Sequence, residues 1–109
     1  MIIQKITHNT DISYILINND KQIGFIDIII NYNDNTATII DFLCINQNNG
    51  NGTILLNFII EEMKKLKIKS ILLDDMTDRY RDIHNIYLKF NFIYIHENGP
   101  EMELILNKK

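Results

Sequence analysis

Several features are rare or missing in this 109-residue sequence, and each one bears on the class of protein. The single cysteine, Cys44, excludes an internal disulfide and a cysteine-based metal cluster. No apolar run approaches the roughly 20 residues that a membrane-spanning helix needs, which predicts that the chain does not enter a membrane. The N-terminal residues, MIIQKITHNTD, lack the basic segment, apolar stretch and cleavage site of a secretory signal, and this predicts a cytoplasmic protein.

Neither sign of charge dominates the chain. The net charge is −3 at pH 7, and a nucleic-acid binder that follows the phosphate backbone needs a basic face, so no nucleic-acid partner is predicted. The three histidines, His8, His84 and His96, have neither i,i+4 spacing nor acidic companions that would form a shared metal site. The sequence therefore predicts no metal.

The first half of the chain has the pattern of consecutive β-strands. Its length predicts one domain, residues 1–109, large enough to bury a real core. Four stretches rich in β-branched and aromatic residues are separated by clusters of asparagine and aspartate, which favour turns. These stretches are residues 1–7, 11–18, 23–31 and 36–45. Together they predict an antiparallel meander.

The period of the apolar residues changes in the second half. A stripe at steps of three and four predicts a helix from about Gly52 to Lys67, followed by a strand over residues 68–75. A second helix is expected from Thr77 or Asp78 to about Asn91, and a hairpin of residues 92–97 and 102–107 completes the chain. A strand–helix–strand passage implies a parallel pair. The prediction is an α/β fold, with two main helices and a mixed, mostly antiparallel sheet that contains one parallel pair.

Two of the four glycines, Gly50 and Gly52, lie at the turn from the fourth strand into the first helix. The first backbone N–H groups of a helix have no intrahelical partner and carry the positive end of the helix dipole, so glycines here would let a phosphate approach. The alternative is a tight connection in which glycine serves only the backbone conformation. A P-loop is excluded because Thr53 and Ile54, not lysine and serine or threonine, follow Gly52.

The spacing Gln47, Gly50, Gly52 resembles the Q/R-x-x-G-x-G/A loop that binds acyl-coenzyme A in the GNAT superfamily of N-acetyltransferases. The segment IYLKFNFIYI is similar to the GNAT passage in which a tyrosine-bearing helix ends before a Gly-Phe pair, matched here by Tyr87, Asn91 and Phe92. Asparagine tolerates left-handed geometry nearly as glycine does. The likeness spans roughly residues 12–106. It implies the acyl-CoA N-acyltransferase fold and acetyl-CoA as co-substrate.

The resemblance also assigns site residues. The loop residues that would bind the pyrophosphate of coenzyme A are Gln47, Asn48, Asn49, Gly50, Asn51, Gly52 and Thr53. Main-chain groups of Leu43, Cys44 and Ile45, on the strand before the loop, would bind pantetheine and polarise the acetyl carbonyl. The Cys44 side chain is expected to be an inert core residue, since nothing near it in the sequence supplies a cation that would lower its pKa.

Tyr87 and Asp41 are the candidate catalytic residues. By the resemblance to GNAT proteins, Tyr87 would contact the cofactor and donate a proton to the departing thiolate. The alternative is that Tyr87 only packs in the core as an aromatic residue. Asp41 would accept the proton of the amine, directly or through water, unless its strand position simply points it at solvent.

The implied activity is direct transfer of an acetyl group from acetyl-CoA to a primary amine of a small molecule, peptide or protein. Only about five residues separate the first two strands, where GNAT proteins usually carry two helices that wall the acceptor site. Because of this departure we retain a second hypothesis, that the protein is a non-catalytic module that binds acetyl-CoA or coenzyme A. It also motivates the hypothesis of a homodimer in which a second copy completes the acceptor wall.

Overall fold

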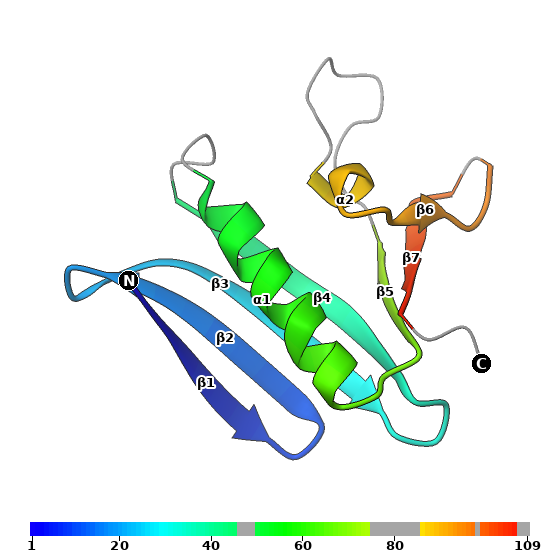
Figure 1. Ribbon diagram of the computed structural model, residues 1–109, viewed down its shortest axis with the longest axis horizontal. Coiled ribbons are helices and arrows are strands. Elements are labelled where there is room, and N and C mark those ends of the chain that lie inside the picture. The colour runs from blue at the N-terminus through cyan, green and yellow to red at the C-terminus, as the bar shows by residue number, and fades with distance from the viewer. Residues whose placement is uncertain (46–49, 75–85, 98, 107–109) are drawn as a thin grey trace.

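The computed structural model describes residues 1–45, 50–74, 86–97 and 99–106. Its strands are β1 (Ile2–His8), β2 (Asp11–Asn18), β3 (Lys21–Asn31), β4 (Thr36–Cys44), β5 (Ser70–Asp74), β6 (Ile93–Tyr94) and β7 (Glu101–Ile105). They form one seven-stranded sheet in the order β1-β2-β3-β4-β5-β7-β6, with β4 and β5 parallel and every other neighbouring pair antiparallel (Figure 1). The predicted mixed sheet with one parallel pair is confirmed.

Tight turns join the first three strands because asparagine and aspartate accept left-handed backbone angles. Asn9 has φ 57° in the β1–β2 turn, and Asn19 and Asp20 have φ 53° and 63° in the β2–β3 turn. Only Asn9 and Thr10 separate β1 from β2, fewer than the five or so residues expected from the sequence. The turn is short because a left-handed Asn9 allows strand pairing to continue to His8 and Asp11.

The predicted first helix is confirmed as α1 (Asn51–Lys65). Its apolar stripe is buried against the sheet through Leu55, Leu56, Ile59, Ile60 and Met63. Leu66 was expected on the same stripe but is exposed, because the helix ends at Lys65 and Leu66 is its C-cap.

Of the second predicted helix, the structure describes α2 (Ile86–Lys89), which ends near Asn91 as expected. Its predicted start at Thr77 or Asp78 lies outside the described residues. Within the part of the chain that the structure describes, α1 is therefore the one long helix, where the sequence predicted two main helices.

The core lies on one face of the sheet, which α1 covers (Figure 1). The buried residues of β2, β3 and β4 alternate along each strand: Ile12, Tyr14 and Leu16; Ile26, Ile28 and Ile30; Ala37 and Ile39. Phe92, which follows α2, and Met102 of β7 extend this core. No described helix covers the opposite face, which we call the far face, and the molecule measures 39 × 36 × 19 Å. Among the described residues, no helix has the length and apolarity needed to cross a bilayer.

Tyr14 is fully buried between β2 and α1, where its ring meets Phe58 edge-on at a centroid distance of 5.7 Å. No described group bonds its hydroxyl. Burial, with a smaller contribution from Glu62, raises the pKa of Tyr14 to about 12. A tyrosine in an unfolded chain ionises near pH 10, so between pH 10 and 12 the unfolded state alone loses the proton and the fold becomes less stable as pH rises.

We expect Tyr14→Phe to raise the free energy of unfolding by about 1 kcal/mol, because it removes a buried hydroxyl that lacks a partner. The variant should also lose less stability than the wild type between pH 10 and 12. Urea unfolding at neutral and alkaline pH measures both effects, and Tyr32→Phe, at an exposed position, is the matched control. A clear loss of stability in Tyr14→Phe would show that the hydroxyl has a partner.

Candidate active site

The parallel strands β4 and β5 pair over only four positions, from Thr36 with Ser70 to Ile39 with Leu73. β4 continues to Cys44, whereas the described part of β5 ends at Asp74. At the last paired position a β-bulge interrupts the β3–β4 ladder: Ile28 pairs with Ile39 and Asp27 with Asp41, so that Ile40 is an extra residue. A bulge bends its strand and increases the local twist. β4 therefore diverges from β5 beyond Ile39 (Figure 1).

The bulge also reverses the face of the sheet to which the later side chains of β4 point. Ala37 and Ile39 point to the α1 side before it, whereas Phe42 and Cys44 do so after it. Asp41 and Leu43 consequently lie on the far face, opposite Asp27 and Phe25. A regular strand would have turned Asp41 into the core.

Backbone groups of β4 beyond the bulge alternate between β3 and the open edge toward β5. The N–H of Ile45 donates to the carbonyl of Ile23 at 2.8 Å, so the main-chain groups of Leu43 and Ile45 face β3. Those of Phe42 and Cys44 face the open edge. The N–H of Phe42 donates to Asp41 Oδ1 at 3.0 Å. Of the three predicted main-chain contacts with the cofactor, the geometry leaves Cys44 as the one directed at the opening.

Gly50 is the N-cap of α1, and its φ of 78° is the left-handed conformation that favours glycine. No side chain caps the helix there, and its first turn, which includes the exposed Thr53, holds no acidic residue. Among the described residues, no atom lies within 4 Å of the position that a Cβ on Gly50 would take. Gln47, Asn48 and Asn49 lie outside the described residues.

Asn51 is buried, and its Nδ2 donates to the carbonyl of Ile45 at 3.3 Å. The side chain therefore ties the start of α1 to the end of β4 and closes the base of the loop. Asn51 can offer a ligand its backbone N–H, but its side chain already has a structural partner.

Glycine is needed at position 52 for a different reason than at position 50. A Cβ at Gly52 would lie 3.2 Å from Ile86 Cδ1 and 3.4 Å from Phe42 Cζ. The absence of a side chain lets α1, α2 and β4 meet closely at one point. One glycine thus serves backbone conformation and the other serves packing.

Tyr87 lies at this junction. Its ring is half-buried, with centroids 6.2 Å from Phe42 and 5.7 Å from Phe92. The helix ends as predicted, with Asn91 at φ 71° and the N–H of Phe92 donating to the carbonyl of Tyr87 at 3.1 Å. Tyr87 therefore has the packing role that the sequence left as an alternative, and it lies beside the strand that opens.

Asp41 and Tyr87 lie on opposite sides of β4. Tyr87 contacts Phe42 on the helix side, whereas the neighbouring Asp41 is exposed on the far face. Cys44 is half-buried, and burial raises the pKa of its thiol, which keeps it protonated and weakly nucleophilic near neutral pH.

A cavity of about 480 Å³ lies where β4 and β5 part. Its walls include Ile39 and Ile40 of β4, Leu72 of β5 and Met102 of β7, and the carboxylates of Asp74 and Glu101 also line it. No sequence signal singled out these two acidic residues, because only the pairing of β5 with β7 sets them opposite each other.

No protein-family model matches this sequence, and no curated protein matches it. Solved structures are similar in fold. The ribosomal-protein-S18-alanine N-acetyltransferase from Escherichia coli matches 94% of this chain and 74% of its own, with 18% identity and a TM-score of 0.76. An acetyltransferase of the GNAT family from Staphylococcus aureus Mu50 matches 90% of this chain and 69% of its own, with 20% identity and a TM-score of 0.75. The PaiA N-acetyltransferase from Thermoplasma acidophilum, solved with coenzyme A, matches 88% and 61%, with 20% identity and a TM-score of 0.70.

The chain has the GNAT fold. This confirms the fold that the glycine loop and the Tyr-Asn-Phe segment indicated in the sequence. At these levels of identity the likeness concerns the fold alone, so the roles of the site residues stay predictions.

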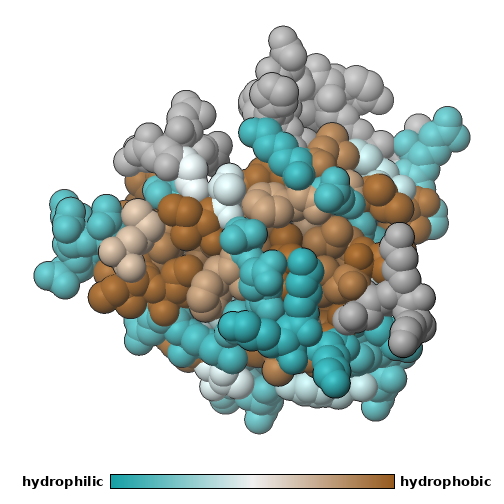
Figure 2. Space-filling view, in the orientation of Figure 1, coloured by the Kyte–Doolittle hydropathy of each residue, from teal (hydrophilic) through white to brown (hydrophobic). Residues whose placement is uncertain are grey.

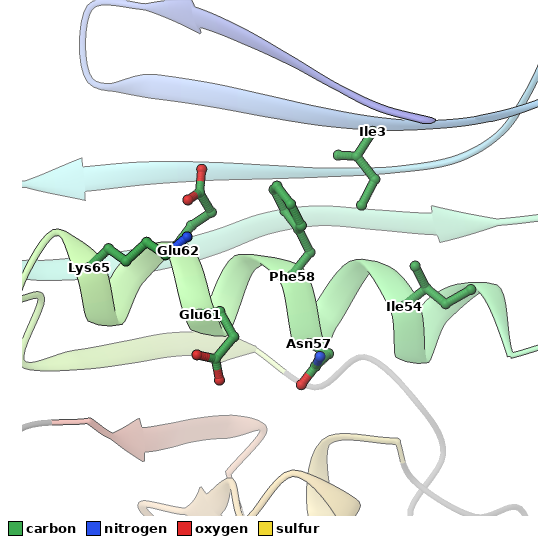
Figure 3. A pocket seen from close by; sticks show the side chains of 7 residues that line it. All are labelled: Ile3, Ile54, Asn57, Phe58, Glu61, Glu62 and Lys65. Atoms are coloured by element: carbon green, nitrogen blue, oxygen red, sulfur yellow. The ribbon is translucent and has the colours of Figure 1, made fainter. Parts of the chain in front are cut away.

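A second hollow, of about 330 Å³, lies between β1 and α1, away from the β4–β5 opening (Figure 3). Ile3 and Phe58 point toward each other across it, and Lys5 of β1 makes a 3.8 Å ion pair with Glu62 of α1 nearby. None of the site residues expected from the GNAT resemblance lines this hollow. None of them lines the 480 Å³ cavity either. We place the candidate site at the β4–β5 opening because the main chain of Cys44 faces that edge and Tyr87 packs on Phe42 beside it.

Gly52→Leu should destabilise the protein by about 1 kcal/mol or more. Overpacking against Phe42 and Ile86 costs about 1–3 kcal/mol, and the better helix propensity of leucine offsets less than about 1 kcal/mol of this. Thr53→Leu, one residue on and exposed, is the control and should change stability by no more than about 0.5 kcal/mol. Equal effects of the two substitutions in urea unfolding would contradict the close contact at Gly52.

Proposed function

We propose that this protein is an acetyl-CoA-dependent N-acetyltransferase that transfers an acetyl group directly to a primary amine. The observation that carries the proposal is the position of Asp41 and Tyr87. The Asp41 carboxylate and the Tyr87 phenol lie on opposite sides of β4, beside the point where that strand leaves β5. Direct transfer needs a proton acceptor and a proton donor, one on each side of the reacting carbon.

The start of α1 suits the diphosphate of coenzyme A. The first-turn N–H groups have no intrahelical partner and no side-chain cap among the described residues, and together with the positive end of the helix dipole they favour an anion. Since the Asn51 side chain is bonded to Ile45, we expect this loop to bind through main-chain N–H groups of Gly50, Asn51, Gly52 and Thr53. The main chain of Cys44 would hold the pantetheine arm. The T. acidophilum structure with coenzyme A supports this ligand.

Bound acetyl-CoA would supply the acetyl group as a thioester. An alkyl amine has a pKa of about 10.4 and is protonated near neutral pH, so it must lose a proton before it can attack. Asp41, exposed on the far face, would accept that proton directly or through water. As the new C–N bond forms and the C–S bond breaks, the Tyr87 hydroxyl would donate a proton to the sulfur. The cavity between β4, β5 and β7 would admit the amine from the far face.

The second candidate is a module that binds acetyl-CoA without turnover. It is supported by the turn of only two residues between β1 and β2, which leaves no helix there to enclose an acceptor. Both candidates require binding of coenzyme A, and they differ in turnover.

We expect calorimetry to detect coenzyme A binding, and acetyl-CoA with a panel of primary amines to release free thiol. Binding with turnover supports the enzyme. Binding without release of thiol for any amine supports the module. A Kd of about 1 mM corresponds to a binding free energy of roughly −4 kcal/mol. If no binding is detected at about millimolar coenzyme A, both candidates are contradicted.

Tyr87→Phe should lower kcat by about 100-fold or more while changing the Kd for coenzyme A by no more than about threefold, because the phenol acts as a general acid and the ring retains its packing. Tyr32→Phe, at an exposed tyrosine in the β3–β4 turn, is the control and should match the wild type. An equal loss of binding and turnover in Tyr87→Phe would argue against a proton-donor role.

A further inference from the structure

The far face of the sheet carries many exposed apolar side chains. Strand register and alternation place on it the exposed residues Ile2, Ile6, Ile29, Ile40, Leu43, Ile93 and Ile105. On the helix side, shown in Figure 2, hydrophilic side chains lie across the centre of the view and hydrophobic areas remain on either side of them. Ile15, Phe25 and Leu43 lie opposite one another on neighbouring strands of the far face, so its apolar area is continuous from β2 to β4. A contiguous exposed apolar patch is characteristic of a surface that binds another molecule.

The far face is also acidic. The same register places on it the carboxylates of Asp11, Asp27, Asp41, Asp74, Glu101 and Glu103. None of the described strand positions assigned to this face is a lysine or an arginine. Lys5, the charged residue of β1, points the other way and pairs with Glu62 of α1.

Two pairs of carboxylate residues face each other directly across neighbouring strands. Asp27 lies opposite Asp41, and Asp74 lies opposite Glu101. Like charges directly opposite on a sheet disfavour each other. Glu101 also has a basic neighbour, since its Oε2 lies 3.5 Å from Nε2 of His96, which is charged only when protonated. A bound cation would relieve the repulsion in both pairs. The two pairs flank the point where β4 and β5 diverge, because Asp41 belongs to β4 and Asp74 to β5.

A second copy of the chain does not suit this surface. Two far faces packed together would bring these carboxylates against one another without a balancing lysine or arginine, which disfavours association. A small polyamine would satisfy the charges but would leave most of the apolar side chains in water. A polypeptide segment with both lysine and apolar side chains satisfies both features.

We propose that the far face docks a lysine-containing, partly apolar polypeptide segment, and that this segment carries the acceptor amine. The assignment of the acceptor rests on the proposed acetyltransferase function, whereas the docking does not. A lysine between the two carboxylate pairs would place its ammonium group at the cavity where β4 and β5 part.

Docking is tested with three probes and the full chain, without coenzyme A. The first is a labelled peptide of about 12 residues composed of lysine, leucine and serine, the second is its counterpart with glutamate for lysine, and the third is spermine as a competitor. In fluorescence anisotropy we expect the lysine peptide to bind and the glutamate peptide not to bind. The Kd of the lysine peptide should rise by about tenfold or more between about 0.05 M and 0.5 M salt. Spermine should compete only weakly.

The double variant Asp27→Asn with Glu103→Gln should raise the Kd for the lysine peptide by about tenfold. The asparagine oxygen can still accept the hydrogen bond that Ser13 donates to Asp27. The control variant, Asp20→Asn with Glu61→Gln, changes the net charge equally in the β2–β3 turn and on α1 and should change the Kd by no more than about twofold.

The proposal is overturned if the glutamate peptide binds equally well, if the two double variants behave alike, or if spermine binds as tightly as the lysine peptide. It is also overturned if solution mass shows a dimer that only the far-face variant disrupts. Mass spectrometry of the peptide after incubation with acetyl-CoA then tests the acceptor role. If the peptide binds but coenzyme A does not, the proposed enzyme is rejected and the docking surface is supported. If coenzyme A binds but the peptide does not, the docking surface is rejected and the proposed function is not.

Discussion

Among the described residues, β4 pairs with a strand on each side as far as Ile39 and with β3 alone after the bulge at Ile40. This change in pairing determines most of what surrounds the candidate site. It directs the main chain of Cys44 toward an open edge, brings Phe42 under α1 and α2, and turns Asp41 to the far face. A continuous β4–β5 ladder would have saturated these backbone groups and left no space between the strands.

The helix side of the opening depends on close contacts among three elements. Gly52 of α1, Phe42 of β4 and Ile86 of α2 meet within van der Waals distance, and the Tyr87 ring packs on Phe42 and Phe92 beside them. Asn51 secures the same corner by its hydrogen bond to Ile45. Residues for which we propose chemical roles therefore also hold the fold together, so the packing of Tyr87 is compatible with its proposed catalytic role.

The far face follows from a single local feature, the short turn at Asn9 and Thr10. A left-handed asparagine joins β1 to β2 directly, so this connection adds no layer to the sheet, and the molecule is only 19 Å thick along its shortest axis. The resulting surface combines exposed isoleucines with several carboxylates, of which Glu101 also contacts His96, and this composition favours the cationic partner proposed above.

The sequence by itself determined the strands, α1 and the GNAT resemblance, because these depend on local periodicity, on turn-forming asparagines and on a short loop motif. Leu55 and Ile59 repeat at helical spacing and are buried, and Asn91 adopts the left-handed conformation predicted for it. Only the tertiary structure decided the sides of β4 on which the side chains of Asp41 and Cys44 lie, because a one-residue bulge reverses every later side chain and has no signature in composition. The opposition of Asp74 to Glu101 likewise exists only through strand register, which joins residues distant in the sequence.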